Sequence, residues 1–110
     1  MSQVLAEVVQ AGLRELADED FQRRVWTGRG APAEMSSFDE AVETLFDDSG
    51  LEPELGRGRP VFGSELDSKL LALRDLLQRI DADRYPDEII DDPLMADARQ
   101  RAAKILDALP

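Results

Sequence analysis

The chain has 110 residues and a formal net charge of −11, with 24 acidic and 13 basic side chains. It contains no cysteine and no histidine, which excludes disulfides, thiolate nucleophiles, serine–histidine triads and most transition-metal sites. Because nucleic acids and anionic membranes are also negatively charged, we expect the chain to bind neither of them.

The first predicted helix covers residues 3–20, with Ser2 as its N-cap. Its apolar stripe is nearly half the circumference wide, which predicts a helix packed against two neighbours. The stripe consists of Val4, Leu5, Val8, Val9, Leu13 and Leu16. Residues 27–35 follow as an irregular segment, because glycines and a proline interrupt the helical pattern.

The second predicted helix covers residues 37–48. Ser37 and Glu40 form a capping-box pattern at its start. Its apolar face consists of Phe38, Ala41, Val42, Leu45 and Phe46. Residues 49–63 then contain four glycines and two prolines. This density predicts one long irregular loop.

The third predicted helix covers residues 65–81 and is capped by Ser64 with Asp67. Its leucines alternate spacings of four and three, which draws one straight apolar seam. A connector follows at residues 83–91. Within it, Pro86 opens one predicted helical turn that buries the two isoleucines after it.

The last predicted helix covers residues 93–108. Asp92 followed by Pro93 is typical of an N-cap and a first helical residue. Ala98 and Ala102 lie on its apolar face. Because both are small, we expect another helix to approach closely there.

Together these elements predict an all-α single domain over residues 1–110. It is a bundle of about four amphipathic helices with one long Gly/Pro-rich loop. Hydrophobic residues make up 43% of the chain, enough for a folded core. The sequence shows no signal-peptide pattern and no apolar run of the ~20 residues that span a bilayer. We therefore expect a cytoplasmic protein.

Four carboxylates form a candidate metal site. Glu40 and Glu43, and then Glu88 and Asp91, stand three residues apart. These pairs resemble the Glu-x-x-Glu and Glu-x-x-Asp motifs of all-α nucleotide pyrophosphatases of the MazG kind, although they lie farther apart in the chain. That resemblance implies Mg²⁺- or Mn²⁺-dependent hydrolysis, provided that at least three of the four converge on one ion.

Five other residues are candidates for partner binding. Trp26 is followed by Arg29 and preceded by two more arginines, the residue types that dominate interfaces, although tryptophan is also a common core residue. Arg57 and Arg59, like Arg29, lie in glycine-rich loops, where they either bind an anion or pair with neighbouring acids. Leu71 points away from the leucine seam, which predicts an exposed position.

The function class favoured by these observations is a non-catalytic interaction or regulatory module, such as an adaptor, an immunity or antitoxin protein, or an accessory subunit. We expect a basic protein partner or a homodimer formed through the wide stripe of the first helix, and no cofactor. The metal-dependent nucleotide hydrolase is the alternative. Lysine occurs only at positions 69 and 104, and the other basic residues are arginines. We attribute this preference for arginine to the base composition of the genome.

Overall fold

The computed structural model describes residues 4–58 and 60–110. In these two ranges every regular element is helical, with seven α-helices, two π-helical turns and no strand. In chain order they are α1 (Ala6–Ala17), α2 (Glu19–Phe21), η1 (Gln22–Trp26), α3 (Phe38–Glu43), η2 (Thr44–Asp48), α4 (Leu51–Gly56), α5 (Ser64–Gln78), α6 (Pro86–Ile90) and α7 (Pro93–Ala108). The all-α class is confirmed, and about four helices was an undercount.

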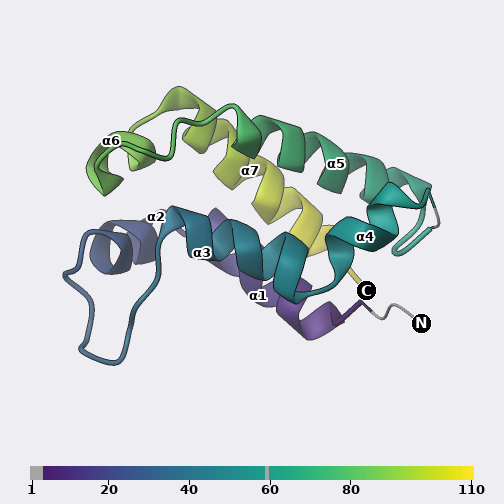
Figure 1. Cartoon of the computed structure of the whole chain (residues 1–110), viewed down its shortest axis with the longest axis horizontal. Coiled ribbons are helices and arrows are strands. Elements are labelled where there is room, and N and C mark those ends of the chain that lie inside the picture. Colours follow the sequence, from purple (N-terminus) through teal and green to yellow (C-terminus); the bar gives the residue numbers. More distant parts are fainter. Residues whose placement is uncertain (1–3, 59) are drawn as a thin grey trace.

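Helix α7 is the central element of the fold. It packs against both α1 and α5, and α1 packs on another side against α3 and η2. In Figure 1, α5 and α7 lie above α1 and α3, while α6 and the loop before α3 lie at one end of the molecule. The two neighbours predicted for the first helix are confirmed. Val9, Leu13 and Leu16 of this stripe are fully buried within the chain, whereas Leu5 is exposed and Val4 and Val8 are half-buried.

The first predicted helix is broken at Asp18. Its backbone is extended (φ −105°, ψ 96°), and its carboxylate accepts the N–H of Phe21 at 3.0 Å, so it caps the new helix α2. The predicted range of 3–20 therefore spans two helices, because an aspartate satisfies free backbone donors better at an N-cap than inside a helix. Leu5 precedes α1 as its N-cap. The predicted cap, Ser2, lies outside the described residues.

Both π-helical turns bury two consecutive side chains. Val25 and Trp26 are buried in η1, and Leu45 and Phe46 are buried in η2. A π turn holds more residues than an α turn, so each residue rotates less around the axis and neighbours share a face. Two large side chains thereby enter the core at adjacent positions.

The prediction of one irregular segment over residues 49–63 is wrong for Leu51–Gly56, which form α4, while the other described residues of that range are irregular. Gly50 supplies the left-handed conformation before the helix (φ +79°). Pro53 falls in the first turn, where its missing N–H costs no intrahelical hydrogen bond. Leu51 and Leu55, four residues apart, are both buried. The number of glycines and prolines was misleading, since their positions permit a helix.

The cap predicted for the third helix is also wrong. Ser64 is the first residue of α5, and Gly63 stands at the N-cap with φ +103°. Buried Asp67 accepts the backbone N–H groups of Val61 at 2.7 Å and Phe62 at 2.9 Å instead. This carboxylate therefore fixes the segment that leads into α5. The helix ends earlier than predicted, at Gln78.

The last helix lies where the sequence predicts it. α7 spans Pro93–Ala108, and Asp92 caps it by accepting the N–H of Leu94 at 2.8 Å. The predicted turn after Pro86 is α6. These two elements begin with a proline, which fixes the backbone angle at the first helical residue.

The Asp92 cap makes stability depend on pH. The pKa of Asp92 lies below its ordinary value because the carboxylate accepts the Leu94 N–H and, secondly, a hydrogen bond from Arg84. Its contribution is therefore complete above the unfolded pKa of about 3.9 and is lost as pH falls through the lower folded pKa. In urea denaturation at neutral pH, Asp92→Ala should lower the free energy of unfolding by about 1 kcal/mol.

The matched control is Asp92→Asn, which keeps an N-cap acceptor and removes only the charge. At neutral pH its free energy of unfolding should lie between those of wild type and Asp92→Ala. Below about pH 3 the difference in this free energy between Asp92→Asn and wild type should shrink. Equal stability of wild type and Asp92→Ala at neutral pH would refute the role of this cap.

Helix α1 and η2 lie in close contact at Gly12. A Cβ atom added there would lie 2.8 Å from the backbone Cα of Leu45. Such a contact forces the two elements apart, since backbone atoms cannot rotate away as a side chain does. Gly12 is therefore a packing requirement.

Gly12→Ala should lower the free energy of unfolding by about 1–2 kcal/mol, measured by thermal or urea denaturation. The direction of this change in stability is diagnostic. In an unobstructed helix, replacing glycine with alanine would raise the free energy of unfolding by about 1 kcal/mol, so a decrease indicates the close contact. Gly56→Ala is the control, because a Cβ at Gly56 meets nothing within 4 Å. A Gly12→Ala variant as stable as wild type would contradict the close contact.

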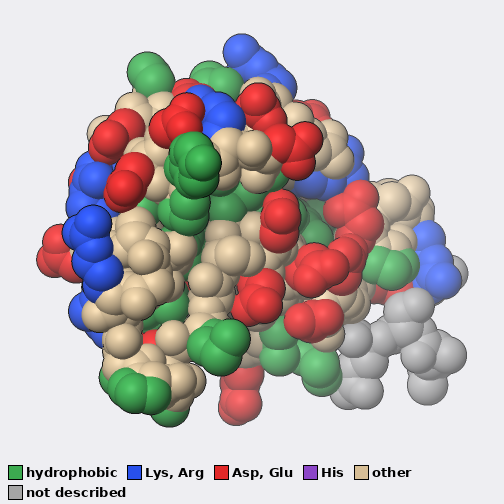
Figure 2. All heavy atoms as spheres, turned by 60° about the vertical axis from the view of Figure 1, so that its left-hand side comes forward, with side chains coloured by type: hydrophobic (Ala, Val, Ile, Leu, Met, Phe, Trp, Pro, Cys, Tyr) green, Lys and Arg blue, Asp and Glu red, His purple; other side chains and the backbone are tan. Residues whose placement is uncertain are grey.

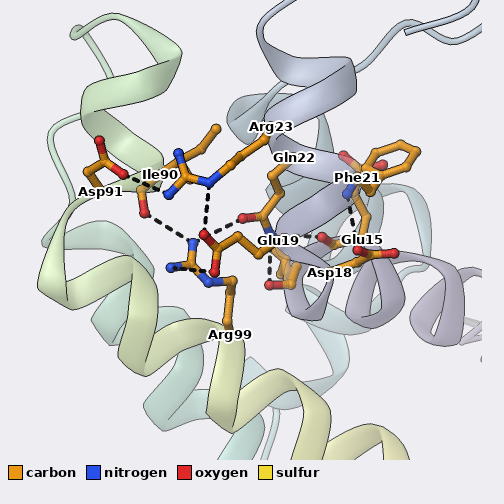
Figure 3. A network of polar contacts seen from close by, with 10 residues as sticks. Glu15, Asp18, Glu19, Phe21, Gln22, Arg23, Ile90, Asp91 and Arg99 are labelled. Carbon is orange, nitrogen blue, oxygen red and sulfur yellow. Dashed lines mark hydrogen bonds and ion pairs between the residues drawn. The ribbon is translucent and has the colours of Figure 1, made fainter. Parts of the chain in front are cut away.

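A buried polar network joins four elements (Figure 3). The fully buried Gln22 in η1 donates from Nε2 to the carbonyl oxygens of Glu15 and Leu16, both at 2.9 Å. Its Oε1 accepts from Arg99 of α7 at 3.1 Å, and Arg99 also donates to the carbonyl oxygen of Ile90 at 3.1 Å. The end of α1, η1, α6 and α7 are thus held together by hydrogen bonds as well as by apolar packing.

Candidate binding groove

A groove runs between α3 and the end of α5 and continues along the connector to α6. It consists of two adjoining hollows of 430 and 170 Å³, which share Phe38, Asp39 and Ala82. The larger hollow is further lined by Val42, Glu43, Leu77, Gln78 and Ile80. The smaller one is further lined by Trp26, Ser37, Arg84, Pro86 and Ile89. Most of this lining is apolar.

The start of α3 builds one wall of the groove. The Oγ of Ser37 accepts the N–H of Glu40 at 3.1 Å, which is one of the two hydrogen bonds of the predicted capping box. Phe38 follows directly and packs edge-on against Trp26, with ring centroids 6.0 Å apart and planes at 82°. Val42, one turn later, is half-buried. The cap and the ring contact therefore fix an apolar wall with one partly exposed side chain.

The connector after α5 builds the opposite wall. Ile80 is buried and Ala82 is half-buried. Arg84 holds this turn in place, because its guanidinium donates to the carbonyl oxygen of Asp81 at 2.9 Å and to the carboxylate of Asp92 at 2.8 Å. The wall is thus anchored to the start of α7.

The open charges of the groove are negative. Asp39 and Glu43 are exposed on α3, and neither has an ion pair or side-chain hydrogen bond with another described residue. Arg84 also lines the groove but is paired with Asp92. Figure 2, which brings the α6 end of Figure 1 forward, shows Asp and Glu side chains on that face with hydrophobic side chains between them. The groove therefore combines an apolar floor with an acidic rim.

One exposed hydrophobic side chain, Tyr85, lies next to groove residues in the chain. In the described part of the chain, the exposed large hydrophobic residues are Leu5, Met35 and Tyr85. Tyr85 is 79% exposed and lies between the groove residues Arg84 and Pro86 in the chain, whereas Met35, 83% exposed, lines a separate hollow beside the loop before α3. Exposed apolar side chains beside an apolar groove extend the surface that a partner would cover.

Of the sequence candidates for partner binding, Trp26 is buried and Leu71 is half-buried within the chain. Trp26 is 5% exposed, and its Nε1 donates to the carboxylate of Glu15 at 3.1 Å. Only part of it lines the end of the groove. The prediction of an exposed Leu71 is wrong: it is half-buried against the core, beside Leu55 and Pro60, because α4 and the following segment cover that side of α5.

The three candidate arginines do not form one site in the described residues. Arg29 is exposed in the loop between η1 and α3. Arg57 follows α4, at the other end of the molecule in Figure 1, and donates to Glu54 at 2.9 Å. Arg59 lies outside the described residues. Intramolecular pairing, one of the two expectations for these arginines, is therefore present at Arg57.

The four candidate metal ligands do not converge. Glu43 lies on the groove rim, Glu40 lines a separate hollow beside the loop before α3, and Glu88 is exposed on α6. Asp91 instead accepts a hydrogen bond from Arg23 at 2.7 Å. Within residues 4–58 and 60–110, no three acidic side chains are placed to hold one ion. The geometry required for carboxylate-metal hydrolysis is thus not met in this part of the chain.

Comparison with known proteins adds no assignment. No family model, no curated protein and no solved structure matches this chain. Among the described helices, none has both the length and the apolar character needed to cross a bilayer. The groove itself is therefore the basis for a functional assignment.

Proposed function

We propose that this chain is a protein-binding module that captures a basic segment of a partner protein in the groove between α3 and α5. The observation that carries this proposal is the apolar floor beside the carboxylates of Asp39 and Glu43, which have no ion-pair partner among the described residues. A cytoplasmic adaptor, an immunity or antitoxin protein, or an accessory subunit would fit such a role.

Each property of the groove has a separate task in this proposal. Apolar side chains of the partner would enter the two hollows, and the area removed from water there supplies most of the binding free energy. Basic side chains beside them would meet Asp39 and Glu43. Complementary rim charges mainly speed association and exclude acidic partners. The net charge of −11 steers a basic partner toward the whole molecule.

Calorimetric titration with two amphipathic peptides tests this function. A leucine–lysine peptide should bind, and a leucine–glutamate peptide of the same length should not. Asp39→Asn combined with Glu43→Gln should weaken binding of the basic peptide about ten-fold, because each exposed rim charge contributes somewhat under 1 kcal/mol.

The matched control is Glu7→Gln combined with Asp107→Asn. Both residues are exposed and lie outside the groove, on α1 and α7. This variant carries the same net charge as the groove variant, so it should bind with nearly wild-type affinity. If both variants lose affinity equally, general acidity is responsible, and the groove proposal is refuted. Equal binding of the acidic peptide would also refute it.

A further inference from the structure

Both lysines of the chain line one cleft between α5 and α7. Lys69 comes from α5 and Lys104 from α7. The cleft has a volume of 300 Å³ and is completed by Asp97, Gln100, Arg101 and Ile105. It shares no lining residue with the groove between α3 and α5. Three cations thus meet in one hollow of a strongly acidic chain.

These cations are available to a ligand. Lys104 has no ion pair or side-chain hydrogen bond with any described residue. Lys69 stands 3.5 Å from Glu65, and Arg101 stands 3.0 Å from Asp97; in both pairs the two side chains are about half exposed or more. Exposed pairs of this kind contribute little free energy, so an anion can replace the carboxylate partners.

We propose that this cleft binds a small polyanion through its carboxylate or phosphate oxygens. The guanidinium of Arg101 suits bidentate contact with either group, and the two ammonium groups add charge from opposite helices. The Gln100 amide adds a neutral donor, and buried Ile105 is an apolar part of the lining. The volume fits a small molecule, and the net charge of −11 opposes a nucleic acid.

Amine acetylation gives a direct test, because Lys69 and Lys104 are the only lysines in the chain. The acetylation rate of each lysine would be followed by peptide mass spectrometry in citrate, inorganic phosphate or acetate, at equal ionic strength. Citrate, phosphate or both should slow acetylation of both lysines, whereas acetate should not. Protection by citrate alone assigns a carboxylate ligand, and protection by phosphate alone assigns a phosphate ligand.

Two arginine variants make the test specific to the cleft. Arg101→Gln should raise the anion concentration needed for half-protection about five-fold, the effect of one exposed charge contact. Arg79→Gln removes an exposed arginine that does not line the cleft, so it should change nothing. The proposal is overturned if no anion protects, if acetate protects equally, or if both variants weaken protection to the same extent.

Discussion

Replacing Arg99 with methionine should lower the free energy of unfolding by about 3 kcal/mol and the melting temperature by roughly 15 °C. Methionine fills similar space but donates no hydrogen bond. The Oε1 of Gln22 and the carbonyl oxygen of Ile90 would each lose a donor. Because Gln22 is fully buried, its amide oxygen has no access to water in exchange. Urea denaturation measures the loss.

Two further variants identify the cause of that loss. Arg79→Met removes an exposed arginine and should change the free energy of unfolding by less than about 0.5 kcal/mol. The double variant Gln22→Leu, Arg99→Met should lose less free energy of unfolding than the two single variants lose in sum. In the double variant both partners of the hydrogen bond are absent, so neither is left buried without a partner. Strict additivity would show that the hydrogen bond between them contributes nothing to stability.

Filling the groove should abolish peptide binding. Ala82 is shared by both hollows, so the indole ring of Ala82→Trp would occupy the space that we assign to the partner. We expect binding of the leucine–lysine peptide to weaken at least about 30-fold, which corresponds to roughly 2 kcal/mol. The free energy of unfolding should change little, since Ala82 is half-buried and the added ring lies in an open hollow.

The control for that variant places the same side chain elsewhere. Ala96 is exposed on α7 and lines neither hollow, so Ala96→Trp should bind the peptide as wild type does. Circular dichroism confirms that both variants stay helical. Undiminished binding to a folded Ala82→Trp protein would exclude the groove as the binding site.

Local chemistry predicted some elements closely. The position of α7 follows from Asp92 and Pro93, and the start of α3 follows from Ser37. These signals act within a few residues, so tertiary contacts do not alter them. The break at Asp18 is also local, but an aspartate opposite an apolar stripe fits the polar face of a continuous helix equally well, so the sequence pattern does not indicate the break.

Longer-range packing decided the elements that were missed. α4 is short, and both its buried leucines pack in the core; its composition alone resembles a loop. The same helix explains the error at Leu71, whose apparent exposure assumed that nothing covered that side of α5. The two buried leucines of α4 have helical spacing, but one pair is too short a pattern to predict a helix of six residues from one sequence.

The groove was not predictable for a related reason. Its walls come from α3 and from the connector after α5, which are far apart in the chain. The sequence placed Val42 on a buried face and assigned no role to Ala82. The sequence contained one indication of the groove. Ile80 and Ala82 follow the end of α5, and apolar residues in that turn indicate a covered surface rather than a solvent-exposed one.

The central claim is that a basic segment binds in the groove, and amide chemical shifts test it most directly. The isotope-labelled chain would be titrated with the leucine–lysine peptide and followed by two-dimensional NMR. We predict that the largest shifts occur at Asp39, Val42 and Ala82 and saturate at one peptide per chain. Shifts that spread evenly over the acidic faces of α1 and α7, without saturation, would contradict the claim.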